Sequence, residues 1–135
     1  LMREEPAMQD APDAKVLQHV QGRIDVDHVS FSYESDLPVL RDVDLHIQPG
    51  ETLAVVGPSG GGKSTLCQLI PRFYDVTEGA IRIDGQDVRQ VTQESLRQNV
   101  GVVQQDVFLF AASILENIRY GHLSICIQKV SQTKL

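Results

Sequence analysis

Apolar and polar residues alternate in two segments near the start of the chain, the pattern expected of half-buried β-strands. The first segment spans residues 24–33, and its alternation changes phase at Asp27 and His28. Such a change of phase predicts a β-bulge, because one extra residue moves the following side chains to the opposite face. The second segment, residues 43–47, ends at a Gln-Pro-Gly turn. We therefore expect antiparallel strands in this part of the chain.

Three short runs of strand-forming residues follow. Residues 52–56 and 100–103 are almost wholly apolar, which is typical of strands buried on both faces of a parallel sheet. Residues 80–83 predict a further strand, and the Asp-Gly pair after them predicts a tight turn. The later part of the chain should therefore contribute strands to a mixed sheet.

Helix signals alternate with these strand signals. Residues 63–70 have apolar side chains at helical spacing, and Pro71 should end or bend that helix. Residues 92–97 predict a short helix with Thr92 as its N-cap. A Ser-x-x-Glu capping box over residues 113–116 predicts a third helix. The alternation predicts an α/β domain with N-terminal antiparallel strands.

Composition and charge narrow the possible functions. The 135 residues are 41% apolar and 22% charged, which is ordinary for one globular domain. Acidic residues give a net charge of −6 and outnumber bases mainly in residues 1–36. No basic stripe runs along the chain, so nucleic-acid binding is disfavoured. Polar residues interrupt the most apolar stretch, residues 100–118, so we expect no membrane-spanning segment here.

A glycine-rich loop between the strand at 52–56 and the helix at 63–70 carries the chemistry. Its sequence fits G-x-x-x-x-G-K-[ST]. Glycines let successive backbone N–H groups turn toward a phosphate, and the following helix adds its positive N-terminal end. The lysine of this motif reaches the β- and γ-phosphates, and the serine hydroxyl is placed to bind Mg²⁺. The predicted nucleotide-binding residues are Gly57, Pro58, Ser59, Gly60, Gly61, Gly62, Lys63, Ser64 and Thr65.

Motifs on both sides of this loop identify a family. An aromatic motif at 29–33 precedes it, Ile-Pro-Arg-Phe-Tyr-Asp follows at 70–75, and Gln-Gln-Asp lies at 104–106. Residues 10–121 resemble the nucleotide-binding domain of ABC transporters, of the exporter type in which a membrane domain precedes it on the same polypeptide. The resemblance implies a P-loop NTPase core of the ABC type, with N-terminal antiparallel strands, truncated before the helical subdomain and the second half of the sheet.

The resemblance also implies roles for individual residues. Tyr33 would stack on the adenine ring of ATP, although an ordinary strand aromatic is the alternative. Gln105 would contact Mg²⁺ or the attacking water and relay the nucleotide state to the membrane domain, with Gln104 as the competing candidate. Lys63 and Gln105 are thus the expected catalytic residues, and Ser64 and Gln105 the expected Mg²⁺ ligands.

The same resemblance divides the chain into three parts. Residues 1–22 would be a linker from an absent transmembrane domain, residues 23–121 a partial nucleotide-binding domain, and residues 122–135 an atypical tail without acidic residues. The sequence contains no Leu-Ser-Gly-Gly-Gln signature, no run of four apolar residues directly followed by Asp (Walker B), no catalytic Glu after such a run and no switch His beyond it. We therefore expect ATP hydrolysis by the parent protein and negligible hydrolysis by this chain alone.

The implied partners are ATP, the transmembrane domain of the same polypeptide, and a second nucleotide-binding domain in a homodimer or heterodimer. The implied location is the cytoplasmic face of a membrane. Two other classes of function stay open. One is a non-hydrolysing P-loop module that binds nucleotide for regulation. The other is an unrelated P-loop kinase, which would need an acceptor-binding lid that the sequence does not show.

Overall fold

The computed structural model describes residues 8–34, 37–103 and 109–120. The chain forms two compact units, Leu1–Val102 and Val103–Leu135. The second unit contains the helix α3 (Ile114–Tyr120). The elements of the first unit are β1 (Ile24–Ser32), β2 (Pro38–Ile47), α1 (Lys63–Leu69), β3 (Glu78–Ile83), β4 (Gln86–Asp87) and α2 (Gln93–Asn99).

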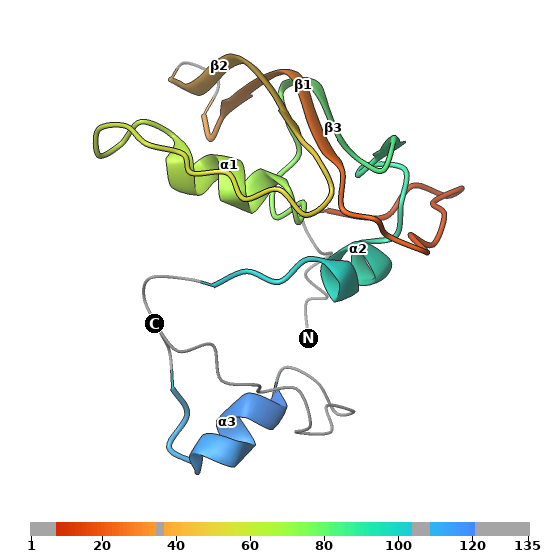
Figure 1. Cartoon of the computed structure of the whole chain (residues 1–135), viewed down its shortest axis with the longest axis vertical. Coiled ribbons are helices and arrows are strands. Elements are labelled where there is room, and N and C mark those ends of the chain that lie inside the picture. Colours follow the sequence, from red (N-terminus) through yellow and green to blue (C-terminus); the bar gives the residue numbers. More distant parts are fainter. Residues whose placement is uncertain (1–7, 35–36, 104–108, 121–135) are drawn as a thin grey trace, which may run out of the picture. The chain divides into compact units, whose positions relative to one another are not determined.

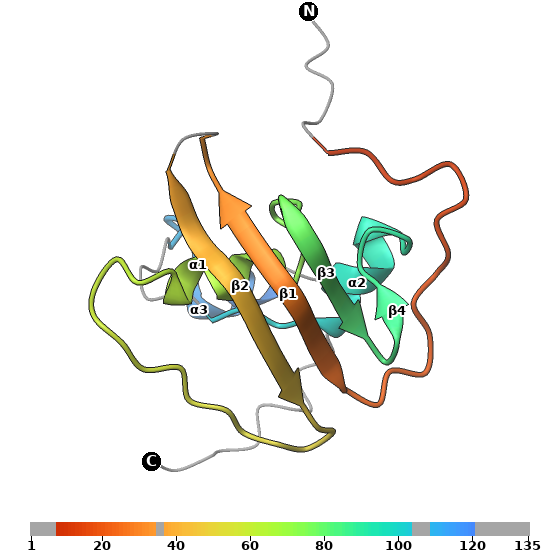
Figure 2. The ribbon, with the colours of Figure 1, turned by 90° about the horizontal axis from the view of Figure 1, so that it is seen from above.

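The strands of the first unit form one antiparallel sheet in the order β2-β1-β3-β4 (Figure 2). Ile24 of β1 lies opposite Ile47 of β2 on one side and opposite Ile83 of β3 on the other. Both α1 and α2 cover the same face of this sheet (Figure 1). The expected N-terminal antiparallel strands are therefore confirmed, and a sheet covered on one face explains why its strands alternate in polarity.

The predicted β-bulge is also confirmed. Pairing of β1 with β2 is regular up to Val26 and shifts before Val29, and His28 between them has a φ of 46°. On the other side of β1, Gly79 of β3 has a φ of 80°, and a Cβ atom there would collide with the carbonyl oxygens of Asp27 and His28. Glycine is therefore required where β3 crosses the bulge.

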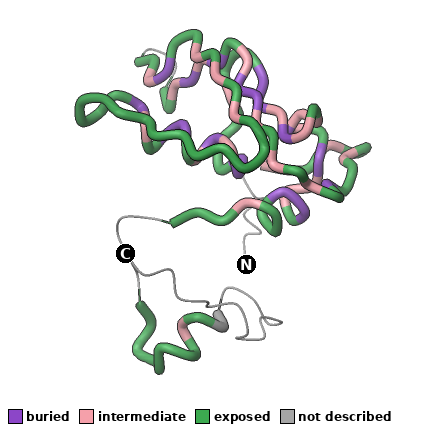
Figure 3. Tube along the Cα trace, in the orientation of Figure 1, coloured by how far each residue is buried: buried purple, intermediate pink, exposed green. Residues whose placement is uncertain are grey.

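The core of the first unit lies between the sheet and its two helices, where Figure 3 shows buried segments. Val26 and Val29 of β1 are fully buried. They pack in one cluster with residues of β2, β3, α1, α2 and the loop after β4, which buries apolar area and stabilises the unit. These members include Leu40, Leu66, Leu69, Ile81, Ile83, Val88 and Leu96.

The segment before β1 contacts the loop that leads into α2 and the first turn of α2. Lys15 exchanges backbone hydrogen bonds with Gln90 and Thr92, both at 2.9 Å. Leu17 is 3% exposed, and its N–H donates to Ser95 Oγ at 2.9 Å. Leu17 thus belongs to the first unit's core, and Lys15 and Leu17 to its hydrogen-bond network.

Helix ends follow their local signals. Thr92 Oγ1 accepts from the Ser95 N–H at the start of α2, as predicted for an N-cap. In the second unit, Ser113 Oγ accepts from the Glu116 N–H at 3.2 Å while Glu116 Oε2 accepts from the Ser113 N–H at 2.9 Å. This reciprocal pair confirms the capping box. Helix α1 ends at Leu69, two residues before Pro71.

The two strands expected at 52–56 and 100–103 are not formed. Residues 52–56 are exposed and belong to no strand, with Val56 88% exposed. Residues 100–103 are likewise outside any strand. A parallel strand buried on both faces needs hydrogen-bonding neighbours and packing layers, and within the described ranges no strand pairs with either segment. None of the described helices is long and apolar enough to span a bilayer.

Candidate functional site

The glycine-rich loop turns sharply before α1. The Gly61 N–H donates to the Pro58 carbonyl at 3.2 Å, and Gly60 and Gly62 have φ values of 79° and 80°. A Cβ atom on Gly62 would collide with the Leu40 side chain of β2. Glycine therefore provides the left-handed backbone and lets the start of α1 approach β2 closely.

Lys63 places its positive charge over this loop. Its Nζ donates to the carbonyl oxygens of Gly57 at 2.9 Å and Pro58 at 2.6 Å. The next residue, Ser64, is exposed. Helix α1 has no side-chain cap at Gly62 and no acidic residue in its first turn, so its first N–H groups keep their capacity to bind an anion.

The structure brings Tyr33 to this helix, although 32 positions separate it from Thr65. The Tyr33 hydroxyl lies 3.1 Å from Thr65 Oγ1 and donates to Gln68 Oε1 at 3.2 Å. Tyr33 follows β1 directly, so the sheet and α1 together position it. An aromatic ring and the glycine-rich loop thus lie within one structural unit.

Other aromatic residues surround Tyr33. Its ring centroid lies 4.9 Å from that of Phe31 and 5.1 Å from that of Tyr74, both in edge-to-face geometry. An open pocket of about 560 Å³ lies beside these rings. The guanidinium of Arg97 lies 5.1 Å from the centroid of Phe73, and both residues line this pocket.

The sequence interpretation did not include Phe31, Gln68 or Tyr74 in the site. A signal for Gln68 was present, because residues three apart on a helix share a face and Gln68 follows Thr65 by that spacing. For Phe31 and Tyr74, the sequence contains the aromatic residues but not their distances. Gln105 and its competitor Gln104 lie outside the described residues, so their proposed roles stay predictions.

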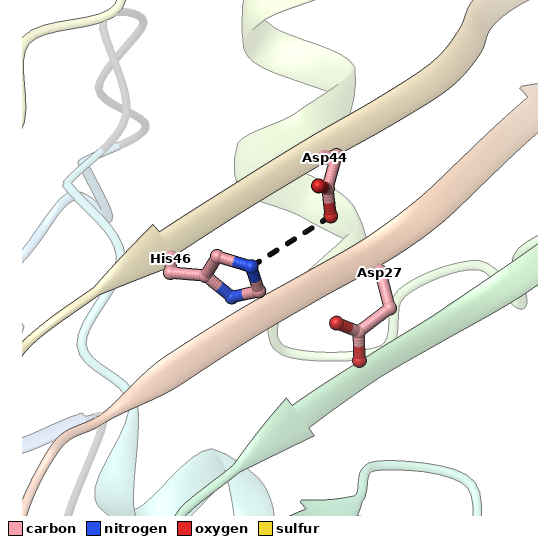
Figure 4. A group of neighbouring side chains, drawn as sticks. All are labelled: Asp27, Asp44 and His46. Carbon is pink, nitrogen blue, oxygen red and sulfur yellow. Dashed lines mark ion pairs between the residues drawn. The ribbon is translucent and has the colours of Figure 1, made fainter.

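The uncovered face of the sheet carries a separate group of charged side chains. Asp27, Asp44 and His46 point toward one another from β1 and β2 (Figure 4). Arg82 forms an ion pair with Asp27, and His46 Nδ1 lies 2.8 Å from Asp25 Oδ1. Asp27 and His46 therefore each have an ion-pair partner, and we interpret the group as an ion-pair network.

Asp25 is the most buried member of this network. Its pKa is lowered by the hydrogen bonds from the Arg23 guanidinium, against the opposing effect of burial and with a further contribution from His46. The Arg23 Nε lies 2.9 Å from Asp25 Oδ2. The network therefore keeps the Asp25 carboxylate charged and tied to β2.

Comparison with known proteins identifies the family. The sequence profile of the ABC transporter family matches residues 40–135, and the chain belongs to this family. An uncharacterized ABC transporter ATP-binding protein of Bacillus subtilis, YwjA, is 55% identical over 91% of this chain and 21% of its own length. Human ATP-binding cassette sub-family B member 6 is 52% identical over 92% of this chain and 15% of its own length.

The fold agrees with this assignment. A bacterial Atm1-family ABC exporter, solved with ATP bound, superposes with a TM-score of 0.81 and 45% identity, covering 84% of this chain and 20% of that chain. The chain therefore has the fold of the N-terminal part of an ABC exporter's nucleotide-binding domain. It spans about a fifth or less of the length of these relatives.

Proposed function

We propose that this chain is the ATP-binding portion of an ABC exporter and that it binds ATP with Mg²⁺ at residues 57–65 and Tyr33. The observation that carries the proposal is the attachment of the Tyr33 hydroxyl to Thr65, at 3.1 Å. It joins an aromatic platform to a helix start whose amide groups are uncapped. The aromatic platform fits a flat base, the uncapped amides fit a chain of phosphates, and the Ser64 hydroxyl fits a divalent cation.

The roles follow from the chemistry of each group. Lys63 would leave the carbonyls of Gly57 and Pro58 and bind the β- and γ-phosphates, since a phosphate oxygen is the stronger acceptor. The backbone N–H groups of Gly60 and of residues 62–65 would hold the phosphate chain, and the Ser64 hydroxyl would hold Mg²⁺. When bound, Mg²⁺ neutralises charge on the phosphate oxygens. Tyr33 would stack on the adenine, because this residue is 51% exposed.

The proposal extends to the parent protein. In it, Gln105 would orient water or Mg²⁺, and two nucleotide-binding domains would bind ATP between them at the cytoplasmic face of a membrane. Hydrolysis would then drive transport through a membrane domain on the same polypeptide. The similarity to an Atm1-family ABC exporter and to a putative multidrug export ATP-binding/permease protein of Staphylococcus aureus, 50% identical over 90% of this chain and 21% of its own length, supports an export role.

Titration of the 135-residue chain with ATP, with and without Mg²⁺, tests the binding site. Lys63→Ala should weaken ATP affinity by about tenfold or more, because a charge-assisted contact to phosphate is lost. Lys15→Ala is the matched control, since this lysine side chain is exposed and belongs to the segment before β1. Equal affinity of Lys63→Ala and the wild-type chain would refute the phosphate-loop assignment.

Steady-state ATP turnover distinguishes an ATP-hydrolysing exporter domain from a regulatory nucleotide-binding module. We propose that this chain alone turns over ATP negligibly, because its sequence contains neither the signature nor the Walker B and catalytic Glu residues. Turnover that disappears in Lys63→Ala would overturn this proposal. A parent protein that binds ATP without hydrolysing it would favour the regulatory nucleotide-binding module.

A further inference from the structure

Two side chains on one face of α1 hold the hydroxyl group of Tyr33. The phenol donates its only proton to Gln68 Oε1 at 3.2 Å. It therefore receives the proton of the Thr65 hydroxyl, 3.1 Å away, because a phenol oxygen can accept as well as donate. Thr65 and Gln68 are three residues apart and so lie on the same side of the helix.

The ring of Tyr33 is also held from the sheet side. Phe31 of β1 meets it at an interplanar angle of 84°, and Tyr74 meets it at 90°. Edge-to-face contacts of this kind stabilise one ring orientation. Tyr33 as a whole is nevertheless 51% exposed, so the side chain is held in place while part of the residue stays accessible to a ligand.

We propose that Gln68 is a positioning residue for the nucleotide base. It would fix Tyr33 relative to the phosphate-binding loop without touching the phosphates itself. This inference rests on the proposed function, in which Tyr33 stacks on adenine. A base and a triphosphate are joined covalently, so both gain full contact only if the platform and the loop lie at the matching separation. Fixing the platform before binding removes the cost of ordering it during binding.

The position of Gln68 favours this role over a purely structural one. Thr65 is buried and directly follows the proposed phosphate-binding motif, so its substitution would disturb both halves of the site. Gln68 lies one helical turn further from the loop, and its side-chain oxygen is directed to Tyr33. Its contribution to α1 packing comes through the backbone, where its carbonyl accepts from the Phe73 N–H at 3.0 Å.

The test compares two probes on the full 135-residue chain, ATP and inorganic tripolyphosphate, both with Mg²⁺. Tripolyphosphate has the phosphates but no base. Tyr33→Phe and Gln68→Leu should each weaken ATP affinity by about three- to tenfold, the effect of one neutral hydrogen bond. Neither variant should change tripolyphosphate affinity. The double variant should bind ATP no more weakly than the single variant with the lower ATP affinity. The reason is that Tyr33→Phe already removes the hydrogen bond to Gln68.

Cys67→Ser is the matched control, because Cys67 is exposed and lies next to Gln68 on α1. It should leave both affinities unchanged. Unchanged ATP affinity in Gln68→Leu, additive losses in the double variant, or an equal loss for both probes would each overturn the positioning role. If instead Lys63→Ala binds both probes like the wild-type chain, the phosphate site itself is wrong, which is a separate failure.

Discussion

At the scale of single residues, Asp84 joins two distant segments of the first unit. Its carboxylate accepts hydrogen bonds from the N–H groups of Gln21, Gly22 and Arg23 at 2.7, 3.3 and 2.9 Å. Burial alone raises the pKa of this carboxyl group, but the bonds from Arg23, Gln21 and Gly22 give a net pKa below its ordinary value. The charged carboxylate therefore attaches the segment before β1 to the turn after β3.

We expect Asp84→Asn to lower the free energy of local opening at residues 21–23 by on the order of 1 kcal/mol, because the side-chain acceptor loses its negative charge. Asparagine tolerates the φ of 49° at this position, so backbone strain does not confuse the result. Hydrogen exchange at these amides should accelerate in the variant. Asp13→Asn, which replaces an exposed acid in the same segment, should leave it unchanged.

The same contact has a predicted pH dependence. Because folding lowers the pKa of Asp84, its stabilisation is fully present above the ordinary Asp value, about pH 4. It is lost as pH falls through the lower pKa of the folded state. Amides 21–23 of the wild-type chain should therefore approach the exchange behaviour of Asp84→Asn below about pH 4. A difference between the two that persisted undiminished there would contradict this role.

Gly79 and Gly85 allow a matched comparison of steric cost. Both have a φ of 80°, but a Cβ on Gly79 would collide with the β1 bulge, whereas one on Gly85 meets nothing within 4 Å. Backbone strain should lower the free energy of unfolding by about 1 kcal/mol in both alanine variants. In Gly79→Ala the free energy of unfolding should fall by about 1–3 kcal/mol more, because β3 must move away from β1. Denaturant unfolding measures both, and equal losses would contradict the close approach of β3 to the bulge.

At the scale of elements, local signals were sufficient for some predictions and insufficient for others. The cap at Thr92 and the bulge at Asp27 and His28 depend on a few neighbouring residues, and the structure confirms both. The runs at 52–56 and 100–103 are almost wholly apolar and were predicted as buried strands, yet they form no strand. A parallel strand depends on partners distant in sequence, which an apolar run by itself does not supply.

In the candidate site, too, some features could be predicted from the sequence and others depend on residues distant in sequence. The loop residues from Gly57 to Ser64 and the aromatic Tyr33 could be chosen from sequence motifs and family resemblance. The contacts that tie Tyr33 to α1 could not, because they depend on how β1 packs over that helix. Helical spacing placed Gln68 on the same face as Thr65, but its contact with Tyr33, and that of Tyr74, are known only from the structure.

At the scale of the whole molecule, the first unit contains both halves of the proposed nucleotide site. Tyr33, the glycine-rich loop and α1 all lie within Leu1–Val102. The family match and the TM-score of 0.81 to an exporter solved with ATP bound support a nucleotide-binding role for this unit. We therefore expect nucleotide binding to depend on the first unit and transport to depend on the parent protein.

The measurement that tests the central proposal most directly is an NMR titration of the ¹⁵N-labelled chain with ATP and Mg²⁺. The proposal predicts saturable chemical-shift changes at the amides of residues 57–65 and at Tyr33. The loop changes, but not the full Tyr33 change, should be reproduced by tripolyphosphate. The proposal is contradicted if ATP leaves the amides of the loop unshifted, or if the saturable changes fall on other segments of the chain.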